Sequence, residues 1–146
     1  MSSLAEIYEE QKKNDEFLAY LRSLVEPGTG DLPYKYFFDA NNKAGKADDA
    51  LKTLEDIRAK HPDDAVVARA LANCYDQTGN KDKAVELYKQ LIAKQPEEPQ
   101  LNRSLGSIYM AQGNDQDAIK CMEITAKVMF FDVGVVNDLG GLYEKS

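Results

Sequence analysis

The sequence predicts an all-α solenoid, built from antiparallel helix pairs and containing about eight to nine helices. Glycines recur at a constant interval of about 34 residues, at Gly45, Gly79 and Gly113. The same interval separates Ala50, Ala84 and Ala118, and no apolar run approaches the ~20 residues that span a bilayer. A fixed period of this size is typical of stacked two-helix units, none of which can bury an apolar face alone.

Each residue type in the period has a physical role. Glycine suits the turn between the two helices, because it enters the left-handed region without a steric penalty. Alanine on the second helix lets the two axes approach to roughly 8–10 Å. Prolines follow the second helix at Pro62 and Pro96 and prevent it from continuing. Leucine and tyrosine at three- and four-residue spacing complete the apolar stripes, as in Leu71, Tyr75, Tyr88 and Leu91.

The period divides the chain into consecutive units. We predict three full units at 31–64, 65–98 and 99–132, all within one solenoid that spans 1–146. Residues 1–30 form a degenerate unit or an N-terminal cap, with Leu4-Ala5-x-x-Tyr8 on its first helix and Phe17 in place of the small alanine. We expect its two helices to pack more openly or to merge into one.

Residues 133–146 carry the pattern of a first helix, with Val136, Leu139-Gly140 and Tyr143, and no second helix follows before Ser146. An apolar side without a neighbour is unusual for a terminal unit, which normally turns a polar face outward. We therefore interpret this segment as the first helix of an incomplete repeat, and the chain as a piece of a longer protein. The alternative is that it is a natural cap.

The units resemble the tetratricopeptide repeat. The second reads Leu71-Ala72-x-x-Tyr75, Gly79 and Ala84-x-x-x-Tyr88, and the third reads Leu105-Gly106-x-x-Tyr109, Gly113 and Ala118-x-x-x-Met122. The family pattern is Leu-Gly-x-x-Tyr on the first helix and Ala-x-x-x-Phe on the second. The resemblance covers nearly the whole chain and implies a right-handed superhelix whose first helices line a concave, peptide-binding groove.

Composition restricts the classes of partner. Eighteen basic against twenty-five acidic residues give a net charge of −7, which opposes general affinity for nucleic acid or anionic membranes. The first twenty residues contain acidic groups throughout and no continuous apolar segment, so we expect no signal peptide and a cytoplasmic location.

No catalytic, metal or cofactor site is predicted. Cys74 and Cys121 are expected to be buried, reduced thiols, because neither belongs to a C-x-x-C pair. His61 lies at a helix end without a nucleophile beside it in the pattern, and the paired carboxylates recur at helix starts, where anions favour the helix dipole. No phosphate-binding glycine motif and no calcium-loop spacing appears, so we predict that the chain is not an enzyme.

The candidate site lies along the groove that the resemblance implies. The fifth place of each unit is a cation, Lys35, Arg69 or Arg103, which would set three positive charges ~10 Å apart and suit an acidic extended peptide. Further predicted contacts are Tyr36, Asp39, Asn73, Ser107 and Met110. The alternative is that the cations provide solubility and pair with nearby acids such as Asp39 or Asp76.

Two specialised sites of the family find little support. Arg69 and Asn73 match two of the five places of the carboxylate clamp that binds chaperone tails, but the remaining places do not match. The asparagine ladder of the sugar-transferring members is absent from the corresponding positions, which are Tyr36, Ala70, Ser104 and Asp138.

Three functions remain open. The first is a module that binds a protein or an acidic peptide in its groove. The second is a structural spacer that self-associates through 133–146, and the third is an arm that presents substrates to a larger enzyme. Charge reversal at Arg69 and Arg103 would test the first function, and the dependence of the mass on concentration would test the second. The third would be tested by the full-length sequence.

Overall fold

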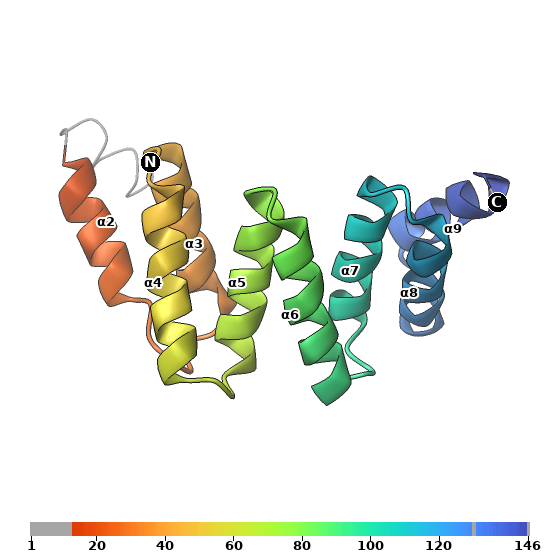
Figure 1. The fold of residues 1–146 in the computed structure, drawn as a ribbon, viewed down its shortest axis with the longest axis horizontal. Helices are drawn as coiled ribbons and strands as arrows, with labels where there is room; N and C mark the ends of the chain where they lie inside the picture. Colours follow the sequence, from red (N-terminus) through yellow and green to blue (C-terminus); the bar gives the residue numbers. More distant parts are fainter. Residues whose placement is uncertain (1–12, 130, 146) are drawn as a thin grey trace. The chain divides into compact units, whose positions relative to one another are not determined.

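The computed structural model describes residues 13–129 and 131–145, and within them the protein is all-α, as predicted (Figure 1). Helices α2 to α5 belong to a first compact unit, Met1–Thr78, and helices α6 to α9 to a second, Gly79–Ser146. The helices of the first unit are α2 (Asn14–Ser23), α3 (Asp31–Lys43), α4 (Ala47–Lys60) and α5 (Ala65–Gln77). Those of the second are α6 (Lys81–Lys94), α7 (Pro99–Ala111), α8 (Asp115–Val128) and α9 (Val133–Lys145).

The helices follow the repeat period of the sequence. Asp31, Ala65, Pro99 and Val133 begin α3, α5, α7 and α9, so successive first helices start one period apart. The predicted first helix of the degenerate unit, around Leu4 and Tyr8, lies outside the described residues.

The turns and packing positions have the predicted geometry. Gly45 and Gly113, between the helices of two pairs, have φ values of 72° and 71°, in the left-handed region that an L side chain disfavours. Ala50 and Ala118 have no exposed surface. Helix α4 ends at Lys60, as expected for a helix that is followed by Pro62.

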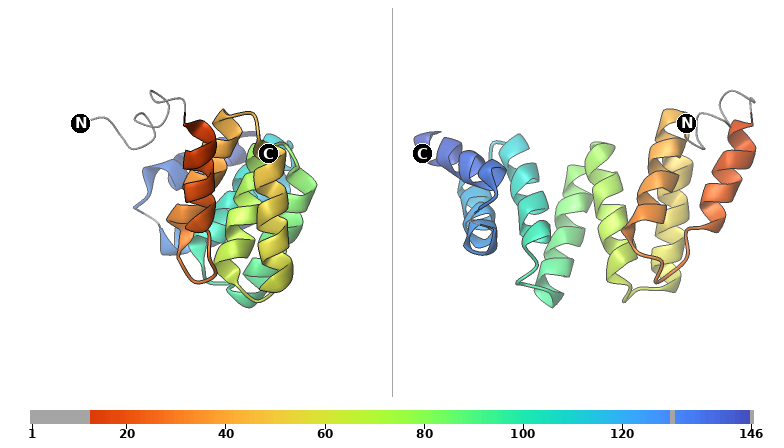
Figure 2. Two further views of the ribbon diagram at one scale, coloured as in Figure 1. Left: turned by 90° about the vertical axis from the view of Figure 1, so that its left-hand side faces the viewer. Right: turned by 180° about the vertical axis from the view of Figure 1, so that it is seen from behind.

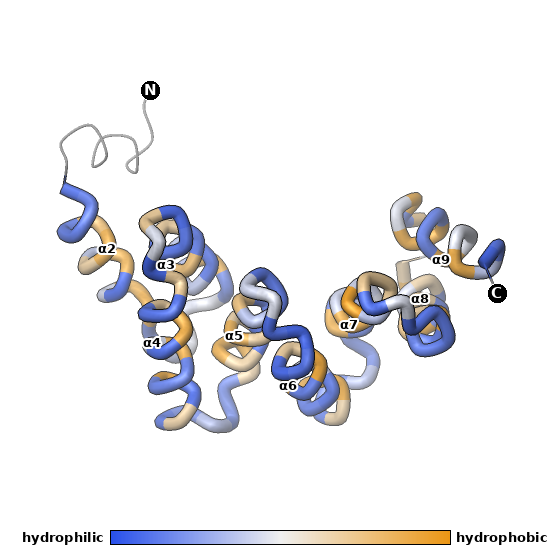
Figure 3. The backbone as a smooth tube through the Cα atoms, turned by 45° about the horizontal axis from the view of Figure 1, so that its top comes forward, coloured by the Kyte–Doolittle hydropathy of each residue, from blue (hydrophilic) through white to orange (hydrophobic). Residues whose placement is uncertain are grey.

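The first unit is formed by α3 and α4 packed antiparallel, with α2 against α3 and α5 against both (Figure 2). Its core includes Tyr34, Phe38, Leu54 and Val67, each at most 1% exposed. Figure 3 shows apolar and polar stretches alternating along these helices, as expected for helices that bury one stripe.

The second unit is centred on the α7–α8 pair, against which α6 and α9 pack. Its core includes Tyr88 of α6, Leu101 and Ile108 of α7, Met122 of α8 and Leu142 of α9, each at most 2% exposed. Both cysteines are unpaired and buried, as predicted, and burial raises the pKa of the Cys74 thiol to about 12.

Candidate functional site

The eight predicted binding residues divide between the two units. In the first unit, α3 carries Lys35, Tyr36 and Asp39, and α5 carries Arg69 and Asn73. In the second unit, α7 carries Arg103, Ser107 and Met110. All eight lie on first helices of their pairs, and none is buried.

The exposed arc of α3 combines charge with apolar surface. Asp31, Lys35 and Asp39 follow one another at four-residue spacing, and Leu32 and Tyr36 form a second row beside them. Lys35 forms an ion pair with Asp39, and this hydrogen bond raises the pKa of the lysine. Leu32 and Tyr36 remain 62% and 57% exposed. This arc offers a cation and an exposed tyrosine ring, a residue type that is enriched at protein interfaces.

Arg69 joins α5 to this arc. Its Nε donates to Oδ1 of Asp31 at 3.2 Å, and its Nη2 donates to Oδ2 at 2.5 Å. The pair is bidentate, the geometry in which a guanidinium holds a carboxylate most specifically. The sequence indicated that the cations pair with nearby acids such as Asp39 or Asp76, and Asp39 does pair with Lys35. The acid that pairs with Arg69 is Asp31, 38 residues away, which the sequence did not indicate.

Arg103 has a comparable partner in the second unit. Its Nη1 donates to Oδ2 of Asp132 at 2.7 Å. Oδ1 of the same carboxylate accepts the N–H groups of Gly134 at 2.9 Å and Val135 at 3.3 Å, at the start of α9. The Val135 N–H, with smaller contributions from Arg103 and Gly134, holds the pKa of Asp132 below its usual range. Arg103 thus helps to attach the first turn of α9.

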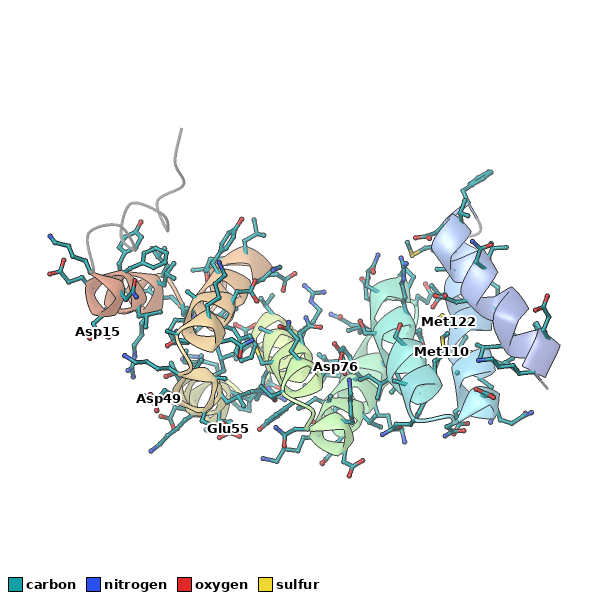
Figure 4. The ribbon with its side chains drawn as sticks, turned by 90° about the horizontal axis from the view of Figure 1, so that it is seen from above. Asp15, Asp49, Glu55, Asp76, Met110 and Met122 are labelled. Atoms are coloured by element: carbon teal, nitrogen blue, oxygen red, sulfur yellow. The ribbon has the colours of Figure 1, made fainter. Side chains whose placement is uncertain are left out.

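The remaining α7 residues differ in accessibility. Ser107 is exposed, while Met110 is half-buried on the same helix. Figure 4 labels Met110 on α7 and Met122 on α8.

The three predicted cations therefore carry carboxylate partners of their own. Asp31 and Asp132 were missed by sequence reasoning as partners, although each stands at the boundary of a repeat unit. Asp31 is the first residue of α3 and Asp132 immediately precedes α9, so their position at the start of a first helix was the available signal.

A second recurring contact links the first helices α5, α7 and α9 to the second helix before each of them. The Tyr75 hydroxyl donates to the Glu55 carboxylate, and the Tyr143 hydroxyl donates to Oε1 of Glu123 at 2.5 Å. In both hydrogen-bonded pairs the tyrosine and the glutamate are 20 residues apart. Between these two pairs, the ammonium of Lys89 lies 5.8 Å from the centre of the Tyr109 ring. The tyrosine of the repeat pattern thus joins neighbouring helix pairs within each unit.

The first unit also has a hollow of about 470 Å³ between α2, α3 and α4, which the sequence did not indicate. Phe37 and Leu18 contribute apolar surface to it, and Lys46 bridges to Asp15 at 2.6 Å. Figure 4 shows Asp15 on α2 and Asp49 on α4 on the same side of the unit. The lining contains three basic and three acidic side chains, so it has no excess of either charge to attract an ion. The basic ones are Arg22, Lys46 and Lys52, and the acidic ones are Asp15, Asp49 and Asp56.

Across residues 13–129 and 131–145, no three His, Cys, Asp or Glu side chains gather as metal ligands would. Within the same ranges, every helix is too short or too polar to cross a bilayer.

Two family models described as tetratricopeptide repeat match the sequence, one over residues 42–108 and the other over residues 103–127. No curated protein matches it. Among solved structures, a crystal structure of MamA is 15% identical with a TM-score of 0.71, and the match covers 99% of this chain and 85% of that one. MamA from Desulfovibrio magneticus RS-1 is 13% identical with a TM-score of 0.70, covering 97% and 81%.

A tetratricopeptide repeat protein from Parabacteroides merdae ATCC 43184 is also similar, at 16% identity and a TM-score of 0.71. That match covers 94% of this chain and 56% of the Parabacteroides protein. At such identities the similarity concerns the fold alone.

Proposed function

Since the chain belongs to the tetratricopeptide repeat family, we propose that it is a non-enzymatic protein-binding module, and that the exposed α3–α5 face of its first unit binds an extended, acidic segment of a partner protein. The observation that carries this proposal is the exposed Tyr36 ring beside Lys35, on the same arc as Asp39. Arg69 and Asn73 on α5 extend the set of polar contacts.

The intramolecular ion pairs of these cations are weak enough for a carboxylate ligand to compete with them. Lys35 and Arg69 already hold the carboxylates of Asp39 and Asp31, and these carboxylates are 38% and 53% exposed. Exposed ion pairs contribute little to stability, typically about 0–1 kcal/mol, so an acidic side chain of a ligand can replace them at small cost. The ligand would then use the same cations, with the Tyr36 ring as an additional apolar contact.

Arg103, Ser107 and Met110 are proposed contacts of the second unit. Because Arg103 also holds the Asp132 cap of α9, its substitution would change the stability of that helix as well as any binding. The first unit therefore provides the cleaner test.

The test is a set of fluorescent ten-residue peptides that differ only in the number of Asp and Glu residues, titrated into the whole chain. We expect affinity to rise with acidic content, and Lys35→Glu or Tyr36→Ala to weaken binding by about tenfold, the change that about 1.4 kcal/mol produces. Lys52→Glu on α4 changes the net charge equally and should leave affinity within about twofold. Equal binding by Lys35→Glu, Lys52→Glu and the parent chain would refute the α3–α5 face as the site.

A structural spacer that self-associates through 133–146 is the second candidate. It is favoured by Val136 and Tyr143 on α9, which are 49% and 52% exposed. The measurement is sedimentation over a wide range of protein concentration. A constant monomer mass would contradict this candidate.

A further inference from the structure

The hollow of the first unit is lined by opposite charges that do not meet. Helices α2 and α4 run in the same direction, and both pack against α3 (Figure 1). Asp15 and Lys46 form an ion pair between the amino ends of α2 and α4. Opposite charges that line one hollow without pairing are too far apart to meet, so a ligand that carries both charges can join them. The lining residues that form no ion pair with any described residue are Arg22, Lys52, Asp49 and Asp56.

The α3 side of the hollow adds a buried polar group to an apolar surface. Phe37 of α3 is 3% exposed, and Leu18 of α2 beside it is 8% exposed. Asn41, one turn after Phe37, is 5% exposed, and its Nδ2 donates to the Phe37 carbonyl at 2.7 Å. Its Oδ1 accepts no hydrogen bond from any described residue. Among those residues no side-chain oxygen is both sealed from solvent and unpartnered, so this oxygen is accessible from the hollow.

The size of the hollow suits a short ligand. Its volume of about 470 Å³ lies within the roughly 300–1,000 Å³ of small-molecule sites. Its α2 wall extends from Asp15 to Arg22, a rise of about 10 Å at about 1.5 Å per residue. An extended peptide covers that length in two or three residues. The ion pair between Asp15 and Lys46 spans one end, so a ligand stops there and does not continue through it.

The unpaired charges lie toward opposite ends of this length. Asp49 belongs to the first turn of α4 and Arg22 to the last turn of α2. Because the two helices run in the same direction, an acceptor for a cation lies near the amino ends and a donor for an anion near the carboxyl ends. Equal numbers of basic and acidic side chains in the lining favour a ligand without net charge.

From these observations we infer that the hollow binds a short zwitterionic peptide, a dipeptide with an apolar side chain. Its ammonium group contacts Asp49 and donates to Oδ1 of Asn41, while its carboxylate accepts from Arg22. Its apolar side chain packs on Phe37 and Leu18. This site is separate from the proposed binding face on α3 and α5 and does not depend on it.

The probe is the dipeptide alanyl-phenylalanine, titrated into the ¹⁵N-labelled whole chain. We expect saturable amide shifts at Leu18, Phe37 and Asn41. Acetylating the amino end of the dipeptide or amidating its carboxyl end should weaken binding by about fivefold or more, because each change removes one charge contact. Alanyl-alanine keeps both charges but lacks the ring, and it should bind at least about fivefold more weakly.

Two substitutions assign the ends of the ligand. Arg22→Gln should weaken the unmodified dipeptide by about fivefold but leave the amidated form, which has no carboxylate, within about twofold. Asp49→Asn should weaken the unmodified dipeptide equally but leave the acetylated form within about twofold. Asp48→Asn is the matched control, because it removes the same charge from the same turn of α4 at a residue that does not line the hollow. It should bind the dipeptide within about twofold of the parent chain.

The inference is overturned if the dipeptide produces no shift at tens of millimolar concentration, or if its unmodified and capped forms bind equally. It is also overturned if Asp49→Asn binds the dipeptide no more weakly than Asp48→Asn does, because the net charge would then govern the affinity. Shifts at Lys35 and Tyr36 instead of Leu18 and Phe37 would place the dipeptide on the α3–α5 face, with the same consequence.

Discussion

Asp64 joins two elements of the first unit through one carboxylate. Its Oδ1 accepts the N–H groups of Val66 at 2.9 Å and Val67 at 3.2 Å, which caps the start of α5. Its Oδ2 accepts the N–H of Gly28 at 3.2 Å, in the turn between α2 and α3. A capping side chain satisfies donors that the helix itself leaves unpaired.

We predict that Asp64→Ala lowers the free energy of unfolding by about 1–2 kcal/mol, the usual loss for a helix cap. Asp64→Ser keeps a capping oxygen but cannot reach Gly28 in the same way, so its loss should be smaller. Urea denaturation followed by circular dichroism measures both. Equal losses for the two variants would assign the effect to the Gly28 contact instead of the cap.

Asp132 gives the stability a defined dependence on pH. The N–H of Val135 lowers its pKa in the folded chain, and Arg103 contributes in the same direction. A carboxyl group whose pKa is lower in the folded state stabilises that state above its unfolded pKa, about 3.9. The stabilisation is lost as the pH falls through the lowered folded value.

The parent chain should therefore be more stable than Asp132→Asn at pH 7, and the difference should persist to about pH 4 and then shrink. Asparagine retains an acceptor for the α9 cap, so the comparison isolates the charge. Urea titrations at a series of pH values provide the measurement. A difference that did not change with pH would show that ionisation of Asp132 has no role.

At the scale of single helices, α7 and α9 differ in what their equivalent glycines meet. A Cβ at Gly106 would lie 3.1 Å from Cys121 Cβ, and that atom cannot move without the α8 backbone. A Cβ at Gly140 would lie in open space.

We predict opposite effects for the same substitution. Gly140→Ala should raise the free energy of unfolding by about 0.5–1 kcal/mol, because alanine favours the helix and nothing obstructs it. Gly106→Ala should lower it by about 1 kcal/mol or more, since overpacking outweighs that gain. Thermal or urea unfolding of the two variants tests the prediction, and stabilisation by Gly106→Ala would mean that α7 and α8 pack less tightly than described.

The helices were predictable from sequence because local signals mark them. Gly45 and Gly113 identify turns by their backbone freedom, and Pro62 identifies a helix end. The pairing of Arg69 with Asp31 could not be derived in this way, since it depends on how α5 packs against α3. The repeat positions did predict which helices carry the candidate site, while the carboxylates that occupy its cations required the structure.

The hollow between α2, α3 and α4 has a similar explanation. Its lining residues come from three helices and share no spacing in the sequence. It lies where the degenerate unit meets the first regular one, and the sequence indicated only that Phe17 replaces the small alanine there. A departure from a pattern shows where packing changes, but the resulting shape depends on all three helices.

For the whole molecule, the net charge repels an acidic ligand, whereas the proposed binding face is locally balanced. The chain carries a net charge of −7, whereas Lys35 and Arg69 on the α3–α5 face are balanced by Asp39 and Asp31. The screening length is about 30 Å at 0.01 M ionic strength and about 10 Å at 0.1 M. An acidic peptide would therefore experience the whole negative chain at low salt and mainly the nearby groups at moderate salt.

We predict that the affinity for an acidic peptide passes through a maximum near 0.1 M ionic strength and falls toward both 0.01 M and 1 M, where the screening length is about 3 Å. Fluorescence anisotropy over this range measures it, and a neutral peptide of equal length should show no maximum. A continuous rise with salt would mean that repulsion dominates and that Lys35 and Arg69 do not contact the ligand. A continuous fall would mean that attraction extends beyond these two side chains, which would place the peptide on a more basic surface than the α3–α5 face.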